Sequence, residues 1–197
     1  MENWRRSMPR GMGTLYWQLN DCWPVVSWSS IDSHGRWKAL HYMARRFYAP
    51  LLVSGVEDPA RGTVEVHVTS DLPRPAAGKL TWTLTDLAGR ALAEGTRRLR
   101  AAPRRSARLM TLRLAPHLKA HGARGVLLWL ELAAGGEVVS TNLVTFARPK
   151  HLELAADPGL SARVRPAGEG TFAVTLRARR PALWAWLEID RDDARWS

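Results

Sequence analysis

Between residues 51 and 148, apolar and polar side chains alternate with the period of two that is typical of β-strands. Val64, Val66 and Val68 fall on one face of such a strand and polar residues on the other. Further strands are predicted over residues 80–85, 90–99, 107–114, 126–132 and 138–146, with glycine-containing turns between some of them. Short strands at this spacing, with no helical period between them, predict an antiparallel β-sandwich of immunoglobulin type.

The same alternation returns after Pro149. We predict strands over His151–Ala155, Ser161–Val164, Thr171–Ala178 and Leu183–Asp190. The segment from residue 149 to residue 197 is much shorter than the roughly 100 residues of a complete sandwich domain. We therefore expect a second immunoglobulin-like sandwich, truncated, of which this chain holds only a part.

Residues 1–50 have a different pattern. Residues 12–17 form a short apolar run, which predicts one buried strand of a parallel sheet. A polar and aromatic loop follows, and residues 37–48 then place apolar side chains at helical spacing until Pro50 ends the helix. One parallel strand and one helix have no core of their own, because such a strand needs neighbours on both sides. We expect the partners of this segment to lie upstream of the chain.

The composition narrows the class of protein. Of the 197 residues, 46% are hydrophobic and 24% are charged, as in ordinary globular proteins. The apolar runs fall far short of the roughly 20 residues of a membrane span, and no apolar stretch follows the basic pair near the N-terminus. We therefore expect no membrane partner and, with no visible secretory signal, a cytoplasmic protein. The single Cys22 excludes an internal disulfide and a multi-cysteine zinc site, and we expect neither a metal nor another cofactor.

The formal net charge of +11 raises the question of a polyanionic partner. Only four of the 29 basic residues are lysines, an arginine bias that is more typical of codon composition than of a phosphate-binding track. One dense cluster consists of Arg97, Arg98, Arg100, Arg104, Arg105 and Arg108. We interpret it as a solvated edge of the sheet and expect no nucleic-acid partner. The alternative, a polyanion site, predicts strongly salt-dependent binding.

Ten tryptophans are many for this length, and five of them fall within the first 37 residues. Trp17 and Trp23 flank Asn20 and Asp21 in one short stretch. An indole face is flat and apolar and suits the C–H face of a pyranose ring, while amide and carboxylate groups beside it can bind the hydroxyls. These four residues are our candidate substrate-binding residues. The competing interpretation is that the indoles only fill a core.

Three stretches carry a resemblance to a known family. They are residues 13–24 (GTLYWQLNDCWP), 27–32 (SWSSID) and 35–42 (GRWKALHY). Together they closely resemble the β-mannosidases of the second glycoside hydrolase family over about 40 nearly uninterrupted residues. A weaker likeness continues to Pro50, and residues 184–188 (WAWLE) and 195–197 (RWS) resemble the last immunoglobulin-like domain of the same family.

The resemblance implies a domain organisation. Residues 1–50 would be the end of a (β/α)₈ catalytic barrel, with the eighth strand at 12–17, the loop at 18–34 and the eighth helix at 35–48. Residues 51–148 would be an immunoglobulin-like sandwich, and residues 149–197 a truncated second one. The expected fold class is therefore mainly β, preceded by the last strand and helix of a barrel. In such barrels a cis peptide bond often follows the tryptophan that corresponds to Trp17, so we expect a cis bond between Trp17 and Gln18.

The resemblance also implies a chemistry. Family members remove non-reducing terminal β-D-mannose with retention, a reaction that uses two carboxylates about 5–5.5 Å apart. The resemblance implies that Trp17 would lie under the sugar, with Asn20, Asp21 and Trp23 at or behind the same pocket. The family's acid/base belongs to an Asn-Glu pair, and no such pair occurs in this sequence. We therefore nominate no catalytic residue and expect the isolated chain to be inactive without the N-terminal part of the enzyme.

A second class of function stays open at this point. The chain could be a non-catalytic immunoglobulin-like module, with an aromatic N-terminal arm, that binds carbohydrate or protein. The coding sequence upstream would discriminate the two, because a barrel with two glutamates there favours the hydrolase. A β-mannoside oligosaccharide or glycoconjugate is the partner expected for the first interpretation.

Overall fold

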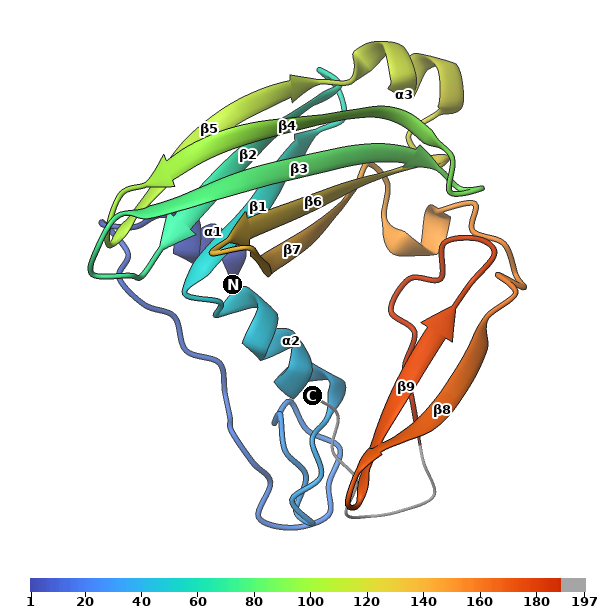
Figure 1. The fold of residues 1–197 in the computed structure, drawn as a ribbon. Coiled ribbons are helices and arrows are strands. Elements are labelled where there is room, and N and C mark those ends of the chain that lie inside the picture. Colours follow the sequence, from blue (N-terminus) through green and yellow to red (C-terminus); the bar gives the residue numbers. More distant parts are fainter. Residues whose placement is uncertain (189–197) are drawn as a thin grey trace.

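Two antiparallel sheets form the centre of the molecule in the computed structural model, which describes residues 1–188 (Figure 1). The first sheet has the strand order β1-β2-β5 and the second the order β4-β3-β6-β7. The strands are β1 Leu51–Asp58, β2 Thr63–Ser70, β3 Ala76–Asp86, β4 Ala91–Ala101, β5 Arg105–Arg113, β6 Val126–Ala134 and β7 Glu137–Thr145. The chain is therefore mainly β with antiparallel pairing, as the period of two predicted.

The core lies between the two sheets. Leu80 and Leu84 of β3 and Leu128, Leu130 and Leu132 of β6 are at most 1% exposed. They pack against valines of β1 and β2, which are fully buried as well. Trp129 and Glu131, which alternate with the leucines of β6, point outward, since successive side chains of a strand point to opposite faces. Burial of these aliphatic side chains provides the main driving force for folding of the sandwich.

The open edge between the two sheets is closed by side chains of β7. Val53 and Gly55 of β1 donate their backbone N–H groups to Ser140 Oγ and Asn142 Oδ1, each at 3.1 Å. Asn142 also donates to Glu2 Oε1 of the N-terminal helix at 2.8 Å. β1 therefore contacts both sheets, although its backbone pairs only with β2. Burial of Glu2 raises its pKa despite the nearby Arg6.

One element contradicts the expectation that no helix interrupts the strands. Residues Ala115–His121 form a short helix, α3, between β5 and β6. Pro116 lies in its first turn, where a proline costs no hydrogen bond, and Gly122 at its end has a φ of 74°. His117 and His121, four residues apart, both lie on this helix.

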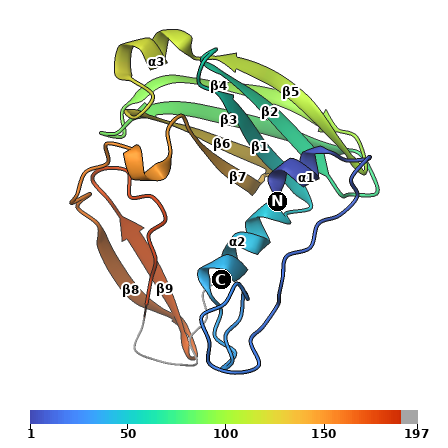
Figure 2. The same ribbon diagram turned by 180° about the vertical axis from the view of Figure 1, so that it is seen from behind.

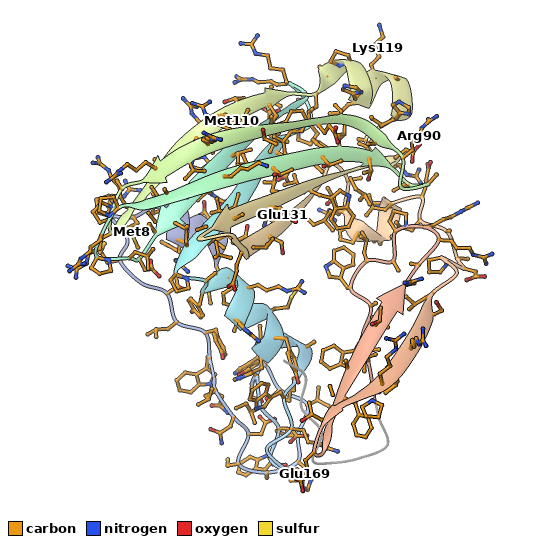
Figure 3. All side chains as sticks on the ribbon, viewed as in Figure 1. Met8, Arg90, Met110, Lys119, Glu131 and Glu169 are labelled. Carbon is orange, nitrogen blue, oxygen red and sulfur yellow. The ribbon has the colours of Figure 1, made fainter. Side chains whose placement is uncertain are left out.

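Helix α2 (Ala39–Phe47) connects the sandwich with the N-terminal segment, and α1 (Glu2–Arg6) packs beside it on the sandwich (Figures 1 and 2). Arg5 of α1 is only 5% exposed. Its guanidinium donates to the carbonyl oxygens of Phe47 (2.7 Å) and Ala49 (3.1 Å) and to Asp71 Oδ2 (2.9 Å). These carbonyls lie at the C-terminal end of α2, where backbone oxygens lack partners within the helix. One side chain thus joins α1, the end of α2 and the loop after β2.

We expect Arg5→Met to lower the free energy of unfolding by about 2 kcal/mol, because it keeps the aliphatic packing but leaves buried carbonyl oxygens without a donor. Urea unfolding followed by circular dichroism measures the change. Arg61→Met is the matched control, since the Arg61 side chain is 83% exposed and forms an exposed ion pair with Asp58. Equal losses in the two variants would contradict the role of Arg5.

The third region is smaller than predicted. Strands β8 (Ser161–Gly168) and β9 (Thr171–Arg177) form a two-stranded hairpin, close to the ranges expected there. Two other expected strands were wrong. Pro149–His151 forms a short 3-10 helix and residues 152–155 do not join a sheet. Residues 183–188 are not a strand either, because Trp184 has a φ of 54°, outside the β region. Residues 189–190 and 195–197 lie outside the described part of the chain.

The predicted strand at 12–17 does not form. This segment runs beside α2 as irregular extended chain (Figure 1) and has no ladder partner within residues 1–188. The physical reason is that a parallel strand needs neighbouring strands. Of the predicted strand, loop and helix, only the helix is regular here, and the barrel stays a prediction. Within residues 1–188, no helix is both long and apolar enough to cross a membrane.

Candidate functional site

The loop of residues 17–31 lies at the far end of α2 from the sandwich (Figure 1). Trp17 is 73% exposed and Trp23 is 65% exposed. Neither indole therefore fills a core formed by the described residues, which was the competing interpretation. Other large apolar side chains of the loop and of the chain just before it are exposed as well: Met12, Leu15, Leu19, Val25, Val26 and Trp28. The peptide bond between Trp17 and Gln18 is cis, which confirms the expectation for this bond.

Asp21 differs from the two tryptophans, because its side chain is only 2% exposed. Its Oδ1 accepts a short hydrogen bond from Ser27 Oγ, and its Oδ2 accepts one from Lys38 Nζ at 2.7 Å. Lys38 also donates to Ser29 Oγ at 2.8 Å. We call these four residues the Asp21 cluster. Both carboxylate oxygens of Asp21 are occupied by the protein's own donors.

The electrostatics of Asp21 follow from these bonds. The hydrogen bond from Lys38 and then that from Ser27 lower the pKa of the Asp21 carboxyl below its ordinary value of 3.8. A carboxyl with a depressed pKa contributes its stabilisation above the ordinary pKa and loses it only as the pH falls through the lowered value. The Asp21 carboxyl therefore stays ionised throughout the pH range in which most proteins work.

Ser30 forms a second centre of hydrogen bonds in the same loop. Its hydroxyl is fully buried and lies 3.0 Å from the Leu19 carbonyl oxygen, 2.8 Å from the Tyr16 hydroxyl and 3.1 Å from His41 Nδ1. The backbone N–H of Ser30 also points to the carbonyl oxygens of Gln18 and Leu19. We call Ser30, Tyr16 and His41 the Ser30 cluster. It holds the two residues that follow Trp17.

The four candidate binding residues thus have different surroundings. Trp17 and Trp23 present exposed rings, and the exposed Asn20 uses its amide N–H to bind the backbone oxygen of Asp21 at 3.2 Å. Asp21 faces inward. The geometry favours a structural role for Asp21, although its assignment as a binding residue stays a prediction.

Sequence reasoning missed the residues that hold this loop. Lys38 and His41 come from the start of α2, and Ser27, Ser29 and Ser30 from the end of the loop. The available signal was the density of short hydroxyl side chains close to an aspartate, since such side chains commonly bond to nearby backbone groups. The sequence does not say that the lysine 17 residues after Asp21 reaches its carboxylate.

The other acidic residues of the first 50 are also engaged. Asp32 Oδ2 pairs with Arg36 Nε at 2.6 Å, while its Oδ1 accepts the backbone N–H groups of His34 and Arg36. Glu2 is bound to Asn142, as described above. Within residues 1–188, no three histidine, cysteine, aspartate or glutamate side chains gather where a metal ion could bind.

The arginine cluster lies on β4, on β5 and in the loop that connects these strands of the two sheets. Arg98 stands opposite Lys79 in the β3–β4 register, and Arg108 binds Glu65 Oε1 at 2.6 Å. This bond, more than that from His67, lowers the pKa of Glu65, while burial lowers the pKa of His67. The absence of a nucleic-acid partner stays an expectation.

Comparison with known proteins gives a consistent result. Residues 62–151 match the family described as Mannosidase Ig/CBM-like domain. β-Mannosidase A of Aspergillus niger is 32% identical over 192 residues, which cover 91% of this chain and 20% of that protein. β-Mannosidase A of Aspergillus fumigatus is 48% identical over 84 residues, or 43% of this chain and 9% of that protein. Over most of its length the chain is similar to one part of these longer β-mannosidases. It spans about a fifth of the length of the A. niger and A. oryzae β-mannosidases it matches.

Solved structures support the fold of the chain. The β-D-mannosidase of Dictyoglomus thermophilum superposes with a TM-score of 0.81 at 24% identity, over 96% of this chain and 23% of that one. An exo-chitosanase of Amycolatopsis orientalis superposes with a TM-score of 0.65 at 19% identity, over 91% of this chain and 24% of that one. The arrangement of sandwich, α2 and N-terminal segment is therefore shared with larger glycosidases.

Proposed function

We propose that this chain is the C-terminal part of a retaining β-mannosidase that removes non-reducing terminal β-D-mannose. The chain supplies part of the wall of the sugar site and the accessory immunoglobulin-like domain. The observation that carries the proposal is the exposed indole of Trp17. Its loop is held by buried hydrogen bonds, and the apolar side chains around it are exposed rather than packed in a core. The A. niger relative, named a β-mannosidase, supports the choice of sugar.

The chemistry assigns a limited role to these residues. The face of Trp17 packs against the apolar C–H face of the mannose ring, and Trp23 extends the apolar surface. Retention requires a nucleophile and an acid/base carboxyl about 5–5.5 Å apart. The sequence has no Asn-Glu pair, and Glu2, Asp21 and Asp32 are each engaged by other groups of the chain. We therefore assign both reacting carboxyls to a barrel outside the chain. Trp17 and Trp23 are thus non-catalytic, and they orient the sugar for the two reacting carboxyls of the barrel.

The proposal predicts that the purified chain does not turn over p-nitrophenyl β-D-mannoside. A chimera tests whether the chain supports activity as part of a longer enzyme. In this chimera, the aligned segment of the A. niger β-mannosidase A is replaced by this chain. We expect the chimera to release p-nitrophenol and the isolated chain to match the buffer blank. Steady turnover by the isolated chain, or a folded chimera that is inactive, would contradict the proposal.

A carbohydrate-binding module is the second candidate, and the description of the family that matches residues 62–151 favours it. It predicts that the isolated chain binds manno-oligosaccharides although it does not cleave them. Isothermal titration with mannotetraose measures this binding. Binding that survives removal of residues 1–50 would place the site on the sandwich.

A further inference from the structure

Nothing in the described core holds the loop that carries Trp17, so its position must come from hydrogen bonds. The apolar side chains of this segment point to solvent, and Leu15 and Val26 are more than 95% exposed. The buried residues of the loop are instead polar: Asp21, Ser29 and Ser30 are at most 4% exposed. A buried polar group is costly unless it is paired, and here the pairing itself fixes the loop.

Lys38 holds the first of these buried groups. It is the residue just before α2, and its Nζ bonds to both Asp21 Oδ2 and Ser29 Oγ. The pair is charge-assisted, and a hydrogen bond of this kind is about twice as strong as one between neutral groups. Lys38 thereby joins the two ends of the loop between residues 21 and 29. Without it, the buried carboxylate of Asp21 would lose a charged partner.

The proton count at Ser30 fixes the role of His41. A serine hydroxyl has one proton to donate and two lone pairs that accept. The Leu19 carbonyl can only accept, so it receives the Ser30 proton. The two remaining partners, the Tyr16 hydroxyl and His41 Nδ1, must therefore both donate to Ser30 Oγ. The geometry places a proton on His41 Nδ1.

Both contacts start from the same end of α2. Lys38 precedes the helix and His41 lies in its first turn, while Trp37 packs against the His41 ring with the centroids 4.5 Å apart. The opposite end of α2 is held to the sandwich by Arg5, as described above. α2 is therefore a connector with fixed ends, which relates the position of Trp17 to that of the sandwich.

We infer that Lys38 and His41 are positioning residues for Trp17, acting through Asp21 and Ser30, and this inference rests on the proposed function. We call the exposed ring of Trp17 the platform, because the sugar is proposed to lie on it. Asp21, one of the candidate binding residues, then serves the site by holding the loop, since both of its oxygens are already occupied.

A first experiment tests the loop alone, in the isolated chain. Amide hydrogen exchange reports the N–H groups of Asp21, Ser30 and Ile31, which bond within the loop. We expect Lys38→Met and His41→Leu to speed exchange at these amides at least about tenfold, because a paired buried group is lost. Lys38→Arg and His41→Asn, which retain a donor near the same place, should stay close to the parent. Unchanged exchange in Lys38→Met and His41→Leu would overturn the inference.

A second experiment tests the effect on the site, in the A. niger chimera. We expect Lys38→Met to lower kcat/KM for p-nitrophenyl β-D-mannoside about tenfold, since a misplaced platform costs orientation, and Lys38→Arg to restore most of it. If Trp17→Ala lowers activity but Lys38→Met does not, this inference fails and the proposed function stands. If Trp17→Ala has no effect while exchange in the loop still depends on Lys38, the proposed function fails and the positioning of the loop stands.

Discussion

Gly55→Ala should lower the free energy of unfolding by about 3 kcal/mol, the upper end of what overpacking of a core usually costs. Gly55 lies on β1 where this strand crosses β7. A Cβ there would overlap Val144 Cγ2 and would lie 3.2 Å from Val64 Cγ1. Both neighbours are buried branched side chains of the core, so neither can move aside. Urea unfolding followed by tryptophan fluorescence measures the loss.

Two further variants separate packing from other effects of the substitution. Gly13→Ala adds the same methyl group where no atom lies within 4 Å, so its stability should change little. The double variant Gly55→Ala/Val144→Ala removes the methyl groups that the new Cβ meets. It should be more stable than the sum of the two single changes predicts, because neighbouring substitutions are not additive. Additive losses would show that the contact with Val144 is not the cause.

The alternation of residues predicted strands β2 to β7 because each of them has a stretch that is buried mainly on one face. β1 has no such pattern. Its first four residues, Leu51 to Ser54, are all buried, so the period of two is absent where it begins. The helix α3 was missed for another reason. It has seven residues, too few to show a helical period, and only Pro116 and Gly122 mark its ends.

Some features of the candidate site depend on neighbouring residues in the sequence, and others depend on contacts between residues that are distant in the sequence. The cis bond after Trp17 was predictable from the family resemblance of one continuous motif. The exposure of Trp17 and Trp23 was one of two interpretations that the sequence left open. The inward turn of Asp21 was not predictable. It depends on hydrogen bonds from Ser27 and from Lys38, which lies 17 residues after Asp21 in the sequence. A sequence shows that a carboxylate is near an aromatic residue, but not which of its neighbours occupies it.

Trp17→Ala should lower kcat/KM of the A. niger chimera for p-nitrophenyl β-D-mannoside about 100-fold. Such a loss corresponds to about 2.7 kcal/mol of transition-state stabilisation, within the range of about 1.5–3 kcal/mol for full burial of a large apolar side chain. The indole is 73% exposed here, so its removal leaves no cavity in the described core and should not unfold the chain. The measurement is steady-state kinetics, with thermal unfolding of each variant recorded in parallel.

Trp129→Ala is the matched control for this variant. Trp129 lies on β6, is 38% exposed, and its indole N–H bonds to Thr85 Oγ1 within the sandwich. Its removal deletes the same ring far along the chain from the loop, so kcat/KM should stay within about twofold of the parent chimera. Trp17→Phe keeps a smaller flat ring and should fall between the two, because part of the stacking surface remains. If Trp17→Ala and Trp129→Ala lose activity equally, the indole at position 17 has no special relation to the sugar.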